Sequence, residues 1–261
     1  MAARAIWKGE LKIASTKVPV KLYSAVNDRT VRFHILDERY RKRVKQHMVD
    51  PDSQEEVPNQ EIQKGFEVEP GTFVIITDED LKSLEPEPSR EIEIAEFVPP
   101  EKVSEQWYER PYYLGPDGDV KSYFALAEAL SKRERIGIAH WVMRNKAYVG
   151  ALRAQDDYLF LFTLRNANEV ISASNLPKPA GREPSEKEVN MAKHLVTLLE
   201  GEFIPADYKD EYRERVMEFI EKKAKGRAPR LSTVKTKRQT TSLDSVLAKS
   251  IASLKKEKSA A

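Results

Sequence analysis

The sequence predicts a mixed, mainly β fold, in which an antiparallel sheet core is followed by C-terminal helices. Three apolar segments, IGIAHWVM, AYVGALRA and YLFLFTLR, follow one another from residue 136, and only the short polar turns RNK and QDD separate them. This spacing is typical of an antiparallel meander. Beyond residue 185, apolar residues recur every three or four positions, which is the helical period.

The first 35 residues are predicted to form strands. LKIASTKVPVKLYSAV contains short β-type runs, and Pro19 within it indicates a strand start or an edge strand. VRFHIL then alternates apolar and polar residues, which predicts a further strand over 31–36.

The next stretch is predicted to leave the core as an extended or hairpin arm, about residues 36–64, and the turn-like DPDS lies within it. It is very basic around Tyr40: its cations are Arg39, Arg41, Lys42, Arg43 and Lys45. On an extended chain, same-face residues lie about 6.6–7 Å apart. The spacing of phosphates along one DNA strand is comparable, so such an arm can follow a backbone without reading the sequence.

The middle of the chain alternates between strand and helix patterns. GTFVIITDEDLKSL predicts a strand and a short helix, with Thr77 or Asp78 as the cap. REIEIAEFV predicts another strand, and YERPYYLGPDGD brings aromatic residues up to a turn. SYFALAEALSKR then has the pattern of an amphipathic helix.

The C-terminal part is predicted to be helical. Ser185 and Glu188 form a capping box that begins one helix, which ends near Gly201, and a second helix follows. Residues 222–240 are predicted to be a basic linker, and residues 241–261 an amphipathic helix with a short basic tail. So short a helix has to bury its apolar face, and the pattern leaves open whether it docks on its own core or on a partner.

The charge is distributed in blocks that favour a polyanionic partner. The net charge is only +2, but residues 1–49 and 222–261 are strongly basic and residues 50–110 strongly acidic. The polyanion would then bind to the basic surfaces and not to the whole molecule. The alternative is that these runs are ordinary solvated faces.

Several function classes lack support in the residues. The chain has no cysteine, which excludes disulfides, thiolate zinc sites and a cysteine nucleophile, and its four histidines are scattered. No phosphate-binding glycine loop or nucleophile elbow is present, so we expect no enzyme, cofactor or metal, although a metal-dependent nuclease remains an alternative. No apolar run is long enough for a membrane span, which predicts a cytoplasmic protein.

Five blocks resemble bacterial Ku, the DNA-end-binding family of non-homologous end joining, in the family's own order. The resemblance spans about residues 4–221 and, weakly, the C-terminal helix. The blocks are IWKGELKIASTKVPVKLYSAVNDRTVRFHIL, EIQKGFEVEPGTFVIITDEDLKSL, IEIAEFVPPEKV, RPYYLGPDG and FLFTLRNANEV.

This resemblance implies a homodimer whose seven-stranded β-barrels and arms close into a ring around duplex DNA. It also implies binding of double-stranded DNA ends without catalysis, association with the nucleoid, and recruitment of a multidomain ATP-dependent end-joining ligase. Residues 1–221 would form the Ku core, with dimerising helices at about 185–224. The runner-up is a nucleoid-type nucleic-acid-binding protein without end selectivity.

The resemblance also assigns roles to residues. The DNA contacts would be Lys8, Lys12, Lys17, Arg32, Arg39, Arg41, Lys42, Arg43 and Lys45. The dimer interface would include Val189, Leu195, Val196, Leu199, Tyr212, Val216 and Phe219. The ligase would bind to Leu243, Val246, Leu247, Ile251 and Leu254. Some relatives carry cysteines in the arm, which suggest metal binding, but this chain has none, so no metal is expected.

Overall fold

The computed structural model describes residues 4–178, 181 and 183–226. The chain divides into two compact units, residues 1–175 and 176–261. In the first unit the helices and strands are β1 (Trp7–Ile13), β2 (Thr16–Ser24), β3 (Lys64–Glu69), β4 (Thr72–Ile76), α1 (Asp78–Ser83), β5 (Glu91–Val98), β6 (Tyr108–Pro116), α2 (Val120–Arg133), β7 (Ile136–Met143), β8 (Lys146–Gln155) and β9 (Tyr158–Leu164).

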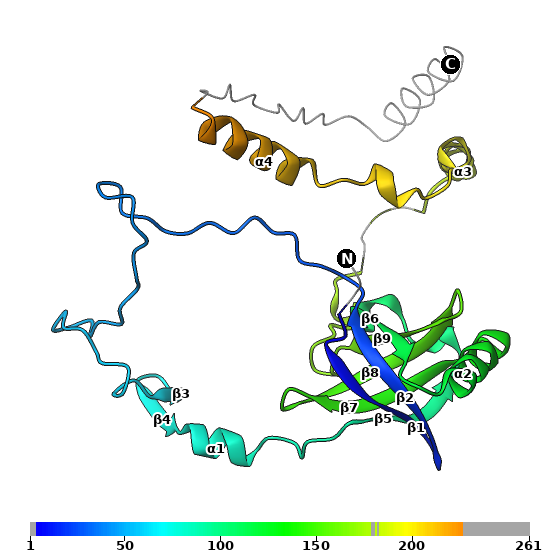
Figure 1. The fold of residues 1–261 in the computed structure, drawn as a ribbon. Helices are drawn as coiled ribbons and strands as arrows, with labels where there is room; N and C mark the ends of the chain where they lie inside the picture. The colour runs from blue at the N-terminus through cyan, green and yellow to red at the C-terminus, as the bar shows by residue number, and fades with distance from the viewer. Residues whose placement is uncertain (1–3, 179–180, 182, 227–261) are drawn as a thin grey trace. The chain divides into compact units, whose positions relative to one another are not determined.

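Seven of the described strands close into a barrel in the order β1-β2-β6-β9-β8-β7-β5 (Figure 1). All neighbouring strands are antiparallel except β1 and β5, which pair in parallel and close the barrel. The predicted meander is confirmed as β7-β8-β9, with two-residue turns at Arg144–Asn145 and Asp156–Asp157. The predicted fold class is therefore confirmed, and the parallel closing pair is the feature that the sequence did not predict.

The barrel interior is filled by the alternating apolar side chains of its strands. Val18, Val20 and Leu22 of β2 are buried, while the residues between them are not. A strand in a barrel points every second side chain inward, so each strand contributes a short apolar row to one core. The other buried strand residues include Leu11, Ile92, Ile94, Leu114, Ala139, Trp141, Leu152, Leu159 and Leu161.

Helix α2 packs its apolar face onto this core. Its N-cap, Asp119, accepts a hydrogen bond from the Ser122 N–H at 3.0 Å. The fully buried Tyr123 hydroxyl donates to the Leu114 carbonyl at 2.5 Å and accepts from the Leu159 N–H at 2.8 Å. Tyr123 thus joins α2 to both β6 and β9, and burial raises the pKa of its hydroxyl.

Between β2 and β5 the chain forms a long arm, residues 25–90, which Figure 1 traces from blue to cyan. The strand predicted over 31–36 is wrong: only Leu36 forms an isolated bridge, with Arg43. The reason is that the arm offers VRFHIL neither a neighbouring strand nor a core, and Phe33 and Ile35 stay 70% and 65% exposed. The structure adds the hairpin β3–β4, of which only β4 was predicted, and α1 begins at the predicted cap Thr77.

The second unit contains α3 (Glu186–Leu199) and α4 (Glu211–Ala224). The predicted capping box is confirmed, because the Ser185 hydroxyl accepts from the Glu188 N–H at 3.4 Å and the Glu188 carboxylate accepts from the Ser185 N–H at 2.7 Å. Asp210 caps α4 by accepting from the Arg213 N–H at 2.9 Å. No described side chain of this unit is buried.

Candidate nucleic-acid interface

The arm has no core of its own. Between Leu22 and Ile92 every side chain is described, and none is buried. Large apolar side chains along it are therefore exposed, among them Tyr40 at 72% and Phe66 at 63%. A segment of this length that buries nothing is typical of a surface made for a partner.

The basic part of the arm folds into a tight turn around Asp37. Its carboxylate accepts hydrogen bonds from the N–H groups of Arg39 at 2.7 Å and Tyr40 at 3.0 Å. The Asp37 carbonyl accepts from the Arg41 N–H at 2.8 Å, and Arg41 takes a positive φ of 52°. Of the two predicted paths, extended or hairpin, the chain therefore takes the hairpin-like one here, because an aspartate that binds the following amides reverses the chain.

A second turn, around Asp50, repeats the same hydrogen bonds. The Asp50 carboxylate accepts from the N–H groups of Asp52 at 3.0 Å and Ser53 at 2.9 Å, and its carbonyl accepts from Gln54 at 2.9 Å. Gln54 has a φ of 59°, and the two amides lower the pKa of Asp50. His47 also contacts Glu56. Here the predicted turn at DPDS is confirmed.

The reversal changes where the five arm cations lie. Because residues 37–42 form the turn and Leu36 bridges Arg43, the four alternating cations do not share one side of a straight strand. They instead surround a compact turn, and all five are exposed. Within the described chain, only Arg39 has a carboxylate within reach, that of Asp37 at 3.9 Å. The turn thus presents cationic groups that an external anion can contact.

The predicted cations on the barrel have a different environment. Lys12 lies 3.2 Å from Glu91 and 3.4 Å from Glu93, whereas Lys17 lies 3.2 Å from Glu10 and also contacts Glu91. These pairs raise the pKa of both lysines and lower that of Glu91. Their assignment as DNA contacts stays a prediction, and a phosphate would have to compete with these carboxylates.

The remaining predicted cations are paired as well. Lys8 lies 3.3 Å from Asp117, which also binds Lys21 at 2.6 Å. In the arm, the Asp28 carboxylate accepts a hydrogen bond from the Thr30 N–H at 2.9 Å and binds Arg32 at 2.8 Å, and Thr30 first and then Arg32 hold its pKa well below the usual range.

The sequence pattern did not predict that these carboxylates pair with the lysines of the barrel. Glu91 and Glu93 alternate with the buried Ile92 and Ile94, so the strand pattern already placed them on the outer face. What the pattern could not supply was the parallel pairing of β5 with β1, which brings Lys12 opposite Glu93.

The predicted dimer residues all lie on α3 and α4 with apolar surface exposed. Val196 and Leu199 are each 65% exposed and Tyr212 is 69% exposed. Val189 is 36% exposed, and Leu195, Val216 and Phe219 are half-buried. Their role stays a prediction. The predicted ligase contacts from Leu243 to Leu254 lie outside the described residues.

Within residues 4–178, 181 and 183–226, no three histidine, aspartate or glutamate side chains gather closely enough to hold a metal ion. No helix in the same part of the chain combines the length and the apolar composition needed to cross a membrane.

The fold defines a class of protein: a closed seven-stranded β-barrel with a long arm inserted between β2 and β5. A family model described as the Ku70/Ku80 beta-barrel domain matches residues 12–191. The chain is 40% identical to the non-homologous end joining protein Ku of Anaeromyxobacter sp. (strain K), over 87% of this chain and 77% of that protein.

Two further relatives carry the same protein name. The chain is 38% identical to the non-homologous end joining protein Ku 2 of Geotalea uraniireducens (strain Rf4), over 87% of this chain and 88% of that protein. It is 36% identical to the non-homologous end joining protein Ku of Mycolicibacterium smegmatis, over 85% of this chain and 72% of that protein. The chain belongs to the Ku family, as its sequence blocks predicted.

Proposed function

We propose that this protein binds the ends of double-stranded DNA, without regard to sequence, in non-homologous end joining. The name that its relatives carry supports the pathway. The observation that carries the binding role is the turn around Asp37, where Arg41, Lys42 and Arg43 are exposed without a carboxylate partner in the described chain. Cations of this kind exchange counterions for phosphates, which gives affinity without base recognition.

A second copy of the chain is the proposed partner for the exposed apolar side chains. The arm buries nothing, and neither do the described parts of α3 and α4, although both helices carry apolar stripes. Burial in a homodimer would remove this surface from water, which is the main driving force for stable association. Two arms and two barrels would then enclose the duplex as a ring.

A closed ring supplies end selectivity by topology. It can pass onto a duplex only where the duplex terminates, so it needs no contact that distinguishes an end from an interior site. In this role the protein performs no catalysis: it holds the break while another enzyme seals it.

The proposed role of residues 241–261 is to recruit the ligase. Their apolar stripe predicts a helix that has to bury one face, and the resemblance to bacterial Ku favours the ligase over the protein's own core as the surface that covers it. Deleting residues 235–261 should leave end binding nearly intact and abolish stimulation of the end-joining ligase. We would measure both with one nicked and one linear substrate, and equal loss of both activities would place this helix in the DNA-binding core instead.

A competition gel shift tests the binding role. The protein is bound to a labelled linear duplex and challenged with covalently closed circular DNA, or with linear DNA whose ends are closed by hairpins. We expect both competitors to be weak and open linear DNA to be strong. Equal competition by all three would favour the runner-up, a nucleoid-type protein without end selectivity.

A further inference from the structure

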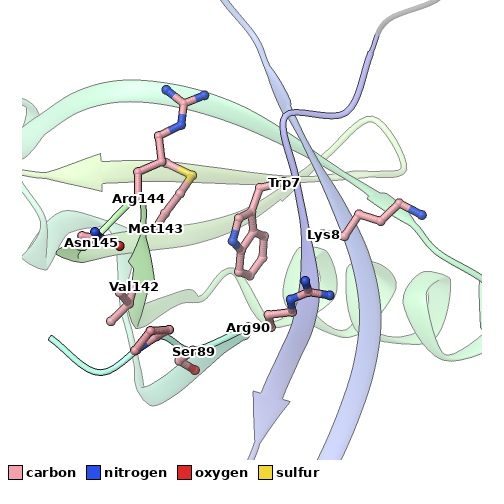
Figure 2. Close-up of a pocket in the computed structure, with 9 residues that line it drawn as sticks. Trp7, Lys8, Ser89, Arg90, Val142, Met143, Arg144 and Asn145 are labelled. Atoms are coloured by element: carbon pink, nitrogen blue, oxygen red, sulfur yellow. The ribbon is translucent and has the colours of Figure 1, made fainter.

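The outer face of the β1–β2 hairpin carries two pairs of lysines. Lys8 of β1 lies directly opposite Lys21 of β2 in the strand register. Further along the same two strands, Lys12 lies opposite Lys17. Trp7 packs against the core, and Figure 2 shows the next side chain, Lys8, pointing away from it on the other side of the strand. Like charges directly opposite each other on neighbouring strands repel, so each pair requires anions close by.

The first pair shares a single carboxylate. One oxygen of Asp117, Oδ2, lies 3.3 Å from the Lys8 ammonium group, and the other, Oδ1, lies 2.6 Å from that of Lys21. The Asp117 N–H donates to the Pro19 carbonyl at 3.0 Å, which holds this residue beside β2. Within the described chain no other carboxylate lies within 4.0 Å of either lysine. Two cations therefore face one anion, and one positive charge remains.

The second pair lies among more carboxylates than lysines. Lys12 binds Glu91 and Glu93. Lys17 binds Glu10 and also contacts Glu91. Two cations thus face three carboxylates, which leaves this cluster with one negative charge. The two pairs occupy equivalent register positions but differ in net charge, and only the first attracts a further anion.

Asp117 marks a position from which one anion reaches both ammonium groups of the first pair. A phosphate also offers two oxygens to neighbouring cations, so it can bind in the same way. Lys8 is exposed, and Lys21 and Asp117 are half-buried at the surface, so a duplex backbone can approach them. The hydrogen bond from Lys21 lowers the pKa of Asp117, so this carboxylate stays charged at neutral pH and competes with an incoming phosphate.

We propose that Asp117 competes with a DNA phosphate for Lys8 and Lys21, and so limits how tightly the barrel holds the duplex. The inference rests on the proposed function, because the phosphate is that of the bound DNA. A protein that encloses the duplex retains it by topology, so a weakened phosphate contact does not release it. The pair formed by Lys12 and Lys17 has no such role, because its own carboxylates exceed its charge.

The experiment measures how the affinity of the full chain for a blunt linear duplex changes with salt concentration. Asp117→Asn keeps the size of the side chain and the backbone hydrogen bond to Pro19, but it frees both ammonium groups. The pair then carries two positive charges in place of one. Binding should therefore tighten, and the slope of log affinity against log salt should steepen by about 0.9. Fluorescence anisotropy of the labelled DNA gives the dissociation constants.

Two further variants separate the lysine pair from the total charge of the protein. Asp157→Asn removes the same charge from an exposed residue of the β8–β9 turn that forms no ion pair in the described chain. Its φ of 65° also suits asparagine, and its slope should stay at the wild-type value. The triple variant Lys8→Gln, Lys21→Gln, Asp117→Asn should lose the gain and show a slope about 0.9 flatter than the wild type. Thermal unfolding of each variant confirms that the barrel is intact.

A lysine footprint tests the same inference on the wild-type protein. Acetic anhydride acetylates accessible lysines, and mass spectrometry gives the extent of acetylation at each site with and without the duplex. DNA should protect Lys8 and Lys21 more strongly than Lys12 and Lys17. This measurement needs no substitution, so it decides the matter even if Asp117→Asn does not fold.

Each outcome has one meaning. A gain in Asp117→Asn that exceeds the change in Asp157→Asn and requires the two lysines supports the proposal. The proposal is overturned if the two aspartate variants change equally, or if the triple variant keeps the gain. Equal protection of all four lysines by DNA also overturns it. Failure of the wild type to bind any duplex would instead reject the proposed function, and this inference with it.

Discussion

At the scale of single residues, the cations of this protein differ in what surrounds them. Lys12 faces two carboxylates within 3.4 Å, whereas Arg41 and Arg43 have no carboxylate partner in the described chain. The sequence identified all three as basic, but it could not show their pairing, because the carboxylates near Lys12 come from β5, far along the chain. Residue type was predictable, and electrostatic environment was not.

The network around Glu91 predicts a specific response to acid. Hydrogen bonds from Lys17 and then Lys12 lower the pKa of Glu91 in the folded state, below its ordinary value of about 4.3. A carboxylate whose pKa is depressed stabilises the fold above its unfolded-state pKa, and this contribution is lost as the pH falls through the folded-state pKa. Glu91→Gln should therefore lower the Tm at pH 7 and reduce the further loss of Tm on acidification.

Thermal unfolding of the variant and the wild type at neutral and acidic pH gives the Tm at pH 7 and the loss of Tm on acidification. Glu87→Gln is the matched control, because Glu87 is exposed and forms no ion pair within the described chain. The account of the network is wrong if Glu91→Gln loses as much Tm on acidification as the wild type does.

At the scale of elements, three barrel strands were predictable from sequence, but the path of the arm was not. Strands β7, β8 and β9 are apolar segments that follow one another with only short polar turns between them, which predicted their antiparallel meander. The arm has no core to impose a pattern, and local hydrogen bonds decide its path. Asp37 and Asp50 each bind two following amides, and only the second turn had a recognisable turn sequence.

The turn around Asp37 predicts which cations determine the salt dependence of DNA binding. Replacing Arg41 and Arg43 by alanine should weaken binding to all duplex sequences about equally. Each lost phosphate contact should also flatten the slope of log affinity against log salt by about 0.9. Binding titrations at several salt concentrations, on two unrelated sequences, measure both effects.

The paired lysines provide the matched control. Lys12→Ala with Lys17→Ala removes the same formal charge from the barrel, but these side chains are already neutralised by Glu10, Glu91 and Glu93. This variant should change the slope less than the arm variant does. A loss that depends on the DNA sequence, or an equal change in both variants, would contradict the role assigned to the arm turn.

At the scale of the whole molecule, the exposed apolar surface predicts association. Val196→Asp with Leu199→Asp places charges on two side chains of α3 that are each 65% exposed. If the helix packs against a second copy, burying each apolar side chain contributes about 1.5–3 kcal/mol, and the charges should dissociate the dimer. Sedimentation equilibrium gives the mass, and thermal unfolding shows whether the barrel survives.

A control variant adds the same charges to the other side of α3. This variant combines Asn190→Asp with His194→Asp. By helical spacing, these two residues lie on the face of α3 opposite Val196 and Leu199. This variant should remain dimeric. If the wild type is monomeric at micromolar concentration, or if both variants dissociate equally, the apolar stripe of α3 is not the interface.

The central claim is that the protein encloses DNA and therefore needs an open end. The most direct measurement adds the protein to a linear duplex either before or after both ends are blocked with bulky protein caps, and then raises the salt concentration. The account predicts that protein added first stays trapped on the capped duplex, whereas protein added afterwards does not bind. Equal binding and equal release in both orders of addition would contradict it.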